Sequence, residues 1–221
     1  VHLQGELLAT GSNRGRAGAA RRSPSPRELI AMTEIRNQTV VVLAGAAGSG
    51  KSTVAAVAAR ALPAALLDID VVYGPIVPLL GGHSHGVVRE AIYEGLAETA
   101  VRAAEAGASV VIAAPFTRER RVPRAWERLS DRCADAGAEA VLVWLRVPEA
   151  TLVERLAARG AGRDAAKMAN TADWLREAMP EVPPGVPHIE LDGTLPAHVT
   201  AHALLAELAA REERVRAACS S

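Results

Sequence analysis

The sequence predicts an α/β fold in which a five-stranded parallel sheet is flanked by helices. From Thr39 onward, short β-branched runs alternate with Ala/Leu-rich amphipathic segments, which is the pattern of βαβ units. A glycine-rich loop at residues 45–50 joins the first run to the first helical segment. The chain has 221 residues, of which 49% are hydrophobic. That is enough for one sizeable core, so we expect one folded domain.

The elements follow from these runs in order. Strands are expected at residues 39–44, 64–68, 109–113, 140–145 and 187–191. Helices are expected at residues 51–61, 87–106, 122–136, 149–159, 170–178 and 196–216. Gly107 and Gly137 follow helical segments, and Pro148 and Pro196 stand where helices begin. These placements match the preference for glycine after a helix and for proline at its start.

The loop after the first strand has the form G-x-x-x-x-G-K-[ST], followed by an Ala-rich helix. In this strand–loop–helix context the glycines allow a tight turn whose backbone amides face phosphate groups. We expect Lys51 to bridge the β- and γ-phosphates and the Ser52 hydroxyl to ligate Mg²⁺. The sequence thus predicts a P-loop NTPase fold that binds ATP and Mg²⁺ through Gly45, Ala46, Ala47, Gly48, Ser49, Gly50, Lys51, Ser52 and Thr53.

Two carboxylates end the second strand, in the stretch LLDID. On an extended segment Asp68 and Asp70 would point to the same side, at the sheet edge where α/β folds bind ligands. One could accept a proton from a substrate hydroxyl, and the other could hold Mg²⁺. The alternative is that they cap the following loop. We expect Asp70 to act as the base and Asp68 as a metal ligand.

The third strand ends without the acid that a motor ATPase usually keeps there, and continues into three arginines. This favours transfer of the γ-phosphate over hydrolysis by an activated water. Arg118 and Arg120 are expected to clamp an anionic substrate or the transferred phosphoryl group. The alternative for these arginines and Arg121 is a solvated basic helix start.

Basic residues recur every four positions from Arg155 to Lys167 and are interrupted by two glycines. We interpret residues 159–170 as a mobile helical lid that carries Arg159 and Arg163 over the phosphates. Unbroken helical spacing would instead have indicated a salt-bridged surface face.

Composition excludes some classes of function. The 25 basic and 25 acidic residues give a net charge of zero, so no bulk attraction to nucleic acid or to an anionic membrane is expected. Aromatic residues make up 3%, too few for a base-stacking platform. Cys133 and Cys219 lack metal-ligand spacing and are expected to be reduced thiols in a cytoplasmic protein. No apolar run is long enough to span a membrane.

Both ends differ from the central region. Residues 1–36 are rich in Gly, Arg, Ser and Pro and are expected to form a disordered basic arm; a partner-binding tail is the alternative. The domain is expected at residues 37–216, and residues 217–221 are expected to fray.

Three motifs resemble those of the small P-loop kinases: the loop at residues 45–53, the LDID strand end, and R-x-x-x-R-D-x-x-K at residues 159–167. This family includes gluconate kinase, shikimate kinase, chloramphenicol phosphotransferase and zeta-toxin-like AAA-type ATP-binding proteins. The resemblance covers most of residues 39–210 and implies a nucleoside-kinase-like fold. It implies substrate and metal contacts for Asp70 and Asp68, adenine stacking by Arg155 or Arg159, and phosphate contacts by Arg163. The loop after the third strand, APFTRER, differs from the corresponding gluconate and shikimate kinase loops, so the substrate does not carry over.

The predicted function is therefore an ATP-dependent kinase that phosphorylates a hydroxyl of a small molecule, such as a sugar, sugar acid, nucleoside or antibiotic. It would act as a monomer or homodimer. The alternatives are a polynucleotide 5′-hydroxyl kinase and a non-catalytic, nucleotide-dependent regulatory module.

Overall fold

The computed structural model describes residues 38–76, 79 and 85–219, so the expected arm at residues 1–36 lies outside the described residues. Its centre is a sheet of five parallel strands in the order β2-β3-β1-β4-β5. The parallel sheet flanked by helices confirms the expected fold class. The strands are β1 (Thr39–Ala44), β2 (Ala65–Asp68), β3 (Val110–Ala113), β4 (Glu139–Arg146) and β5 (Ile189–Asp192).

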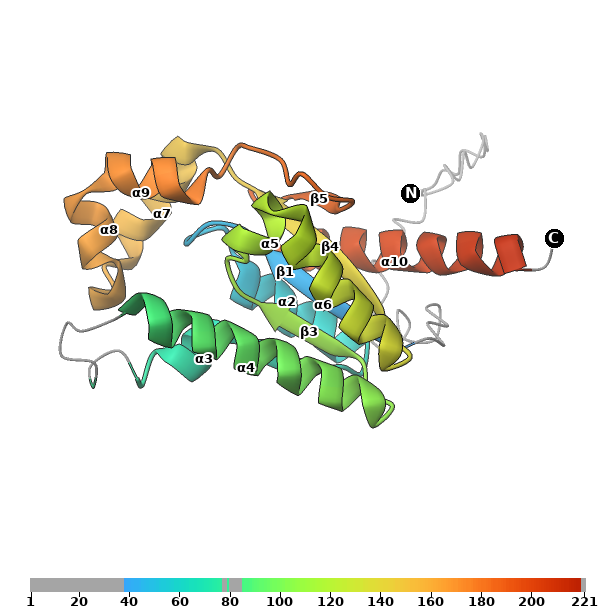
Figure 1. The fold of residues 1–221 in the computed structure, drawn as a ribbon. Coiled ribbons are helices and arrows are strands. Elements are labelled where there is room, and N and C mark those ends of the chain that lie inside the picture. Colours follow the sequence, from blue (N-terminus) through green and yellow to red (C-terminus); the bar gives the residue numbers. More distant parts are fainter. Residues whose placement is uncertain (1–37, 77–78, 80–84, 220–221) are drawn as a thin grey trace, which may run out of the picture.

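Helices cover both faces of the sheet, and the strand sequences explain why (Figure 1). Side chains alternate in β1: Val40 and Val42 enter the core on one face, while Val41 and Leu43 enter the core on the other. A strand that is buried on both faces is a near-continuous apolar run, as β1 is from Val40 to Ala44. The first face is covered by α4 (His85–Glu105) and α6 (Pro123–Asp135), and the second by α2 (Lys51–Ala61) and α10 (Ala197–Cys219).

Several helices differ from the predicted boundaries. The helix expected at residues 122–136 is present as α6, but the structure adds α5 (Thr117–Arg121) before it, with Val122 extended between the two. Pro123 explains the break, because proline disfavours a helical conformation in the residue before it. Helix α10 continues to Cys219, beyond the predicted end at residue 216.

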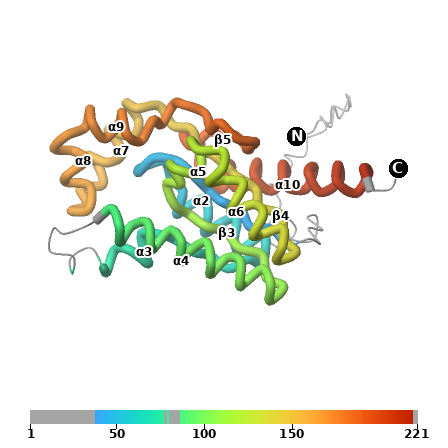
Figure 2. The backbone as a smooth tube through the Cα atoms, viewed as in Figure 1, coloured from blue at the N-terminus to red at the C-terminus, as the bar shows by residue number. Residues whose placement is uncertain are grey.

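The region of the expected lid is helical. Residues 159–170 contain the last residue of α7 (Glu149–Arg159), the short 3-10 helix η2 (Gly162–Asp164) and α8 (Ala165–Ala169), and α9 (Thr171–Ala178) follows them. Figures 1 and 2 show α7, α8 and α9 grouped at one end of the molecule, across from α3 (Ile69–Tyr73) and the beginning of α4. Within the described ranges, no helix is long and apolar enough to cross a membrane.

Candidate active site

The loop between β1 and α2 has the geometry of a phosphate cradle. Gly50 forms the N-cap of α2 with a φ of 90°, a left-handed conformation that glycine adopts without a steric penalty. The N-terminal end of α2 therefore opens toward the loop, where its free amides and partial positive charge favour an anion. The Lys51 ammonium lies across the loop and donates to the carbonyl of Ala46 at 2.7 Å.

The charge of Lys51 depends on its surroundings. Desolvation is the largest influence and lowers its pKa from 10.5 to about 8, although the negative charges of Asp70 and Asp68 act in the opposite direction. The positive charges of Arg120 and Arg159 lower it further. A bound phosphate would add negative charge beside this ammonium and favour its charged form.

The two carboxylates occupy different local structures, which corrects the expectation that both lie on an extended strand. Strand β2 ends at Asp68, whose side chain caps α3 by accepting from the Asp70 amide at 2.9 Å. Asp70 lies in the first turn of α3. The capping role, which the sequence offered only as the alternative, is present for Asp68. Both residues nevertheless line the same cavity as Lys51.

Arg163 of η2, in the segment expected to be a lid, contacts this region: its guanidinium lies 3.3 Å from a carboxylate oxygen of Asp70. A second carboxylate organises the lid internally. Asp164 is only 2% exposed and accepts from Arg159 at 2.8 Å and from Lys167 at 3.2 Å. These bonds bring Arg159 and Lys167, two of the three basic residues of the R-x-x-x-R-D-x-x-K motif, together around one buried acid.

Arg155 connects three segments that surround the phosphate cradle. Its guanidinium donates to the carbonyl of Gly48 at 3.3 Å and to that of Gly193 at 2.8 Å, with a longer contact to Thr194. Gly193 lets the loop after β5 lie close to Val147 and to the phosphate cradle, because a Cβ there would lie 2.5 Å from a Val147 methyl group and 3.0 Å from the Ser49 carbonyl. Arg155 thus fixes the loop after β5 against the phosphate cradle.

These groups face a single cavity of about 730 Å³. Its size is within the range of small-molecule sites. Among the predicted residues, the cavity brings together Ala47, Gly48, Gly50, Lys51, Ser52, Thr53, Asp68, Asp70, Arg155, Arg159 and Arg163. Gly45 and Ala46 line an adjoining cavity of about 340 Å³, together with Arg120.

The oxygen donors present are compatible with Mg²⁺ bound together with a nucleotide. The Ser52 hydroxyl and the Asp68 carboxylate line the cavity beside Lys51. No group of three potential metal-ligating His, Cys, Asp or Glu side chains occurs in the described part of the chain. Mg²⁺ suits such a sparse set, because it usually binds one or two protein oxygens and takes its other ligands from phosphates and water.

The two arginines predicted to bind substrate lie in different environments. Arg118 is exposed and lines a further cavity between α4, α5 and α6. Arg120 is 2% exposed, and its guanidinium donates to the carbonyls of Ala178 and Met179 at 3.1 and 3.2 Å and lies over the Trp144 ring. Arg120 therefore holds the C-terminal end of α9 against the domain.

Arg89 on α4 was missed by the sequence reasoning. It lines the phosphate cavity and both neighbouring cavities. Its guanidinium lies 5.6 Å from the centre of the Tyr93 ring and 4.0 Å from a Glu177 oxygen on α9. The four-residue spacing of Arg89 and Tyr93 on a predicted helix was the available signal, since such pairs share a helix face.

Comparison with known proteins agrees with this architecture. The sequence matches the AAA domain family over residues 40–180. No curated protein sequence matches the chain. Among solved structures, a candidate kinase from Chloroflexus aurantiacus is 19% identical with a TM-score of 0.61, covering 81% of this chain and 98% of its own.

Two further solved structures share the fold at a similar level of sequence identity. A gluconokinase from Sinorhizobium meliloti is 19% identical with a TM-score of 0.53 and covers 82% of this chain and 97% of its own. An APS kinase from Mycobacterium tuberculosis, solved with AMPPNP and APS, is 22% identical with a TM-score of 0.52, covering 78% of this chain and 97% of its own. The chain belongs to the AAA domain family and has the fold of the small P-loop kinases.

Proposed function

We propose that the protein is an ATP-dependent phosphotransferase that moves the γ-phosphoryl group to a hydroxyl of a small molecule. The observation that carries this proposal is the shared cavity, in which Lys51, Ser52, Asp70 and Arg163 face one another. A phosphate cradle alone is compatible with motors and switches. A carboxylate and an arginine beside the cradle are suited to phosphoryl transfer. They could hold the phosphate donor close to the acceptor and stabilise the charge that develops in the transition state.

In the proposed reaction the acceptor oxygen attacks the γ-phosphorus while the bond from that phosphorus to the β–γ bridging oxygen breaks, and ADP leaves. Asp70 accepts the proton of the acceptor hydroxyl. Lys51, Arg159 and Arg163 stabilise the negative charge on the phosphoryl oxygens. Mg²⁺, held by Ser52 and Asp68, would supply further charge neutralisation on the nucleotide.

The remaining arginines divide between two roles in this proposal. Arg155 positions the phosphate cradle and the loop after β5, which we assign to the adenine side. Arg118 contacts the acceptor. Arg120 acts through α9 as a positioning residue, because its guanidinium is already engaged with backbone carbonyls.

The relatives support the same class of acceptor. Solved structures with this fold include a gluconokinase, an APS kinase and a shikimate kinase from Aquifex aeolicus. All three are named as kinases of small molecules. The experiment is a screen for acceptor-dependent ADP release across sugars, sugar acids, nucleosides and hydroxylated antibiotics. ADP release that rises with one acceptor would support the proposal. Release that is the same with and without every acceptor, oligonucleotides included, would favour a regulatory ATPase module.

A further inference from the structure

A second cavity, of about 660 Å³, lies beside the phosphate site, and the proposed function uses only Arg118 of its lining residues. It is enclosed by α4, α5 and α6. Its floor is apolar and buried, formed by Ala97, Phe116, Ala125 and Leu129. Phe116 has a φ of 46°, which is uncommon for a bulky residue, and its ring packs edge-on against Tyr93 at 5.5 Å. A cavity of this size can hold a drug-sized molecule.

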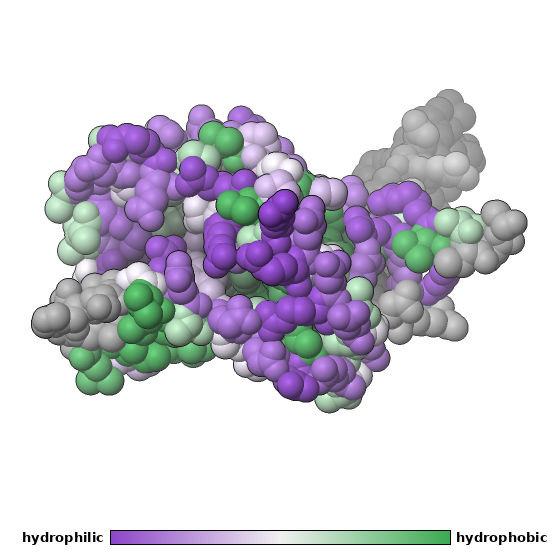
Figure 3. Space-filling view, viewed as in Figure 1, coloured by the Kyte–Doolittle hydropathy of each residue, from purple (hydrophilic) through white to green (hydrophobic). Residues whose placement is uncertain are grey.

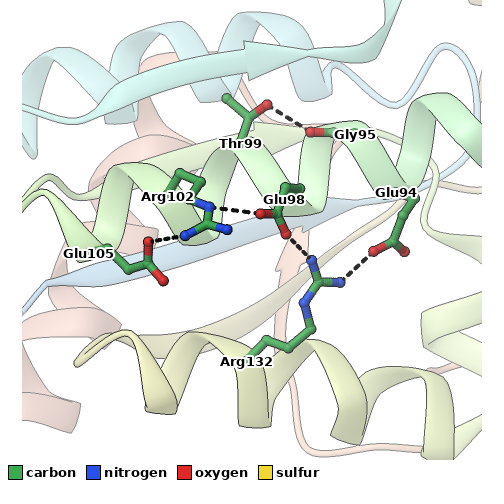
Figure 4. A network of polar contacts seen from close by, with 7 residues as sticks. All are labelled: Glu94, Gly95, Glu98, Thr99, Arg102, Glu105 and Arg132. Carbon is green, nitrogen blue, oxygen red and sulfur yellow. Dashed lines mark hydrogen bonds and ion pairs between the residues drawn. The ribbon is translucent and has the colours of Figure 1, made fainter.

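Ion pairs join α4 and α6, two of the helices that line this cavity (Figure 4). Arg132 on α6 donates to Glu94 and to Glu98 on α4, both at 2.7 Å. Arg132 and Glu94 line the cavity, but the Arg132 guanidinium is already shared between Glu94 and Glu98. This network therefore fixes the distance between α4 and α6 and leaves the recognition of a ligand to other residues.

Three arginines on the cavity rim have no carboxylate partner within 4 Å among the described residues: Arg118, Arg121 and Arg128. They share the rim with Glu90 and Glu119, which likewise have no such cationic partner within the described ranges. Burial raises the pKa of Glu119. Figure 3 shows hydrophilic side chains gathered over α5 and α6 on this face. The arginines outnumber the glutamates by one, which suits an occupant with a single negative charge.

The second cavity adjoins the phosphate site. Arg89 and Tyr93 line both cavities. Thr117 and Glu177 line the second cavity and the adjoining cavity of about 340 Å³. A molecule whose hydroxyl lies near Asp70 could therefore extend past Arg89 onto the apolar floor.

We propose that the second cavity binds the far end of the acceptor, and that the acceptor is an alcohol with an apolar, aromatic body and one carboxylate. The body packs on Phe116 and Tyr93, and the carboxylate contacts Arg118 and Arg128. This inference rests on the proposed phosphotransferase function and adds the chemical class of its substrate.

The test uses a series of aromatic hydroxy acids of increasing length, beginning with para-hydroxymethylbenzoate, each paired with its methyl ester. Binding of each compound to the full chain, loaded with a non-hydrolysable ATP analogue, is measured by titration calorimetry, and ADP release is measured with ATP. A hydrogen bond to a charged group implies that the best acid binds at least about tenfold more tightly than its ester.

Two variants address the two halves of the site. Ala125→Trp fills the apolar floor and is expected to weaken binding of the acids at least about tenfold. Arg128→Glu reverses one rim charge and is expected to remove the preference for acid over ester. Arg124→Glu is the matched control, because Arg124 is exposed on the same helix but does not line the cavity. A melting curve verifies that each variant is folded, and the ATP affinity should be unchanged in all three.

The outcomes separate this inference from the proposed function. If the acids bind equally well to wild type, Ala125→Trp and Arg128→Glu, or if none binds, the cavity assignment is wrong. ADP release that depends on another acceptor and on Asp70 would then leave the phosphotransferase proposal intact. If binding is lost in both variants but no compound releases ADP, the cavity assignment stands and the phosphotransferase proposal fails.

Discussion

Arg163 of the lid lies 3.3 Å from the carboxylate of Asp70 at the start of α3. The two side chains are 51% and 48% exposed, so their ion pair contributes little to stability. Its importance is positional. It brings the Arg163 cation next to the residue that we assign as the base, and both side chains line the phosphate cavity.

Replacing Arg163 by Ala should therefore impair transfer rather than folding. We expect kcat to fall by about 100-fold, because a charge that stabilises the transition state is lost. The melting temperature should be nearly unchanged. Steady-state ADP-release kinetics with a responsive acceptor measure the effect.

Arg176→Ala is the control for that variant. Arg176 belongs to α9, is largely exposed, and pairs with Asp173 outside the phosphate cavity. Its removal should leave kcat within about twofold of wild type, as expected for a surface ion pair. An equal loss in both variants would show that the lid arginines act through general charge and not through position.

Asp164 should be more important for stability than its exposed neighbours. It is 2% exposed and binds both Arg159 and Lys167. Asp164→Ala leaves two cations without their shared partner, and we expect a loss of about 2 kcal/mol in the free energy of unfolding. Urea denaturation measures it. If the urea midpoint and the rate of proteolytic cleavage within residues 159–170 are both unchanged in Asp164→Ala, the stabilising role of Asp164 is contradicted.

Substitutions can separate the capping role of Asp68 from the Mg²⁺ binding that we propose for it. As the cap of α3 it accepts from the Asp70 amide, so Asp68→Ala should cost about 1 kcal/mol of stability. Asp68→Ser retains a capping oxygen but loses the charge, so it should preserve most of the stability and still raise the Mg²⁺ concentration needed for half-maximal activity. Thermal unfolding and a Mg²⁺ titration of ADP release distinguish the roles. If Asp68→Ser needs no more Mg²⁺ than wild type, Asp68 is only a cap.

The phosphate cradle was predictable because its cause is local. The G-x-x-x-x-G-K-S spacing specifies a tight turn between a strand and a helix, and Gly50 takes the left-handed conformation that the turn requires. The apolar run from Val40 to Leu43 likewise indicated a strand, which the structure buries on both faces. In both cases the deciding residues are neighbours in the sequence.

The acceptor side was less predictable because its causes are distant in the chain. Nothing near Arg120 indicates that its side chain would be buried against Ala178 and Met179. The local structure of Asp70 depends on the residue at which β2 ends and α3 begins. The alternation of side chains in the sequence does not indicate that boundary. Arg89 became a candidate only when the packing of α4 placed it between three cavities.

The lowered pKa of Lys51 predicts proton uptake on ATP binding. With a pKa of about 8, Lys51 is charged in about half of the free molecules at pH 8, and bound phosphates favour the charged form. We expect uptake of about half a proton per ATP at pH 8, and an affinity for ATP that falls as the pH rises through 8. Calorimetry in two buffers with different ionisation enthalpies measures this uptake.

Lys51→Met should show neither the proton uptake nor the decline in affinity above pH 8; the same uptake in this variant would assign it to another group. The same pKa shift has the opposite effect on folding: the free energy of unfolding rises with pH, whereas the affinity for ATP falls. The unfolded chain holds the Lys51 proton up to about pH 10.5, whereas the folded protein releases it near pH 8. This group therefore destabilises the fold below pH 8, and that penalty is relieved as the pH rises from 8 to 10.5.

The most direct test of the proposed phosphotransferase is Asp70→Asn, with ATP affinity and acceptor-dependent ADP release measured on the same preparation. The amide keeps the size of the side chain but cannot accept the hydroxyl proton. The account predicts an ATP dissociation constant within about threefold of wild type and a loss of acceptor-dependent release of at least about 100-fold. Undiminished acceptor-dependent release in this variant would contradict it.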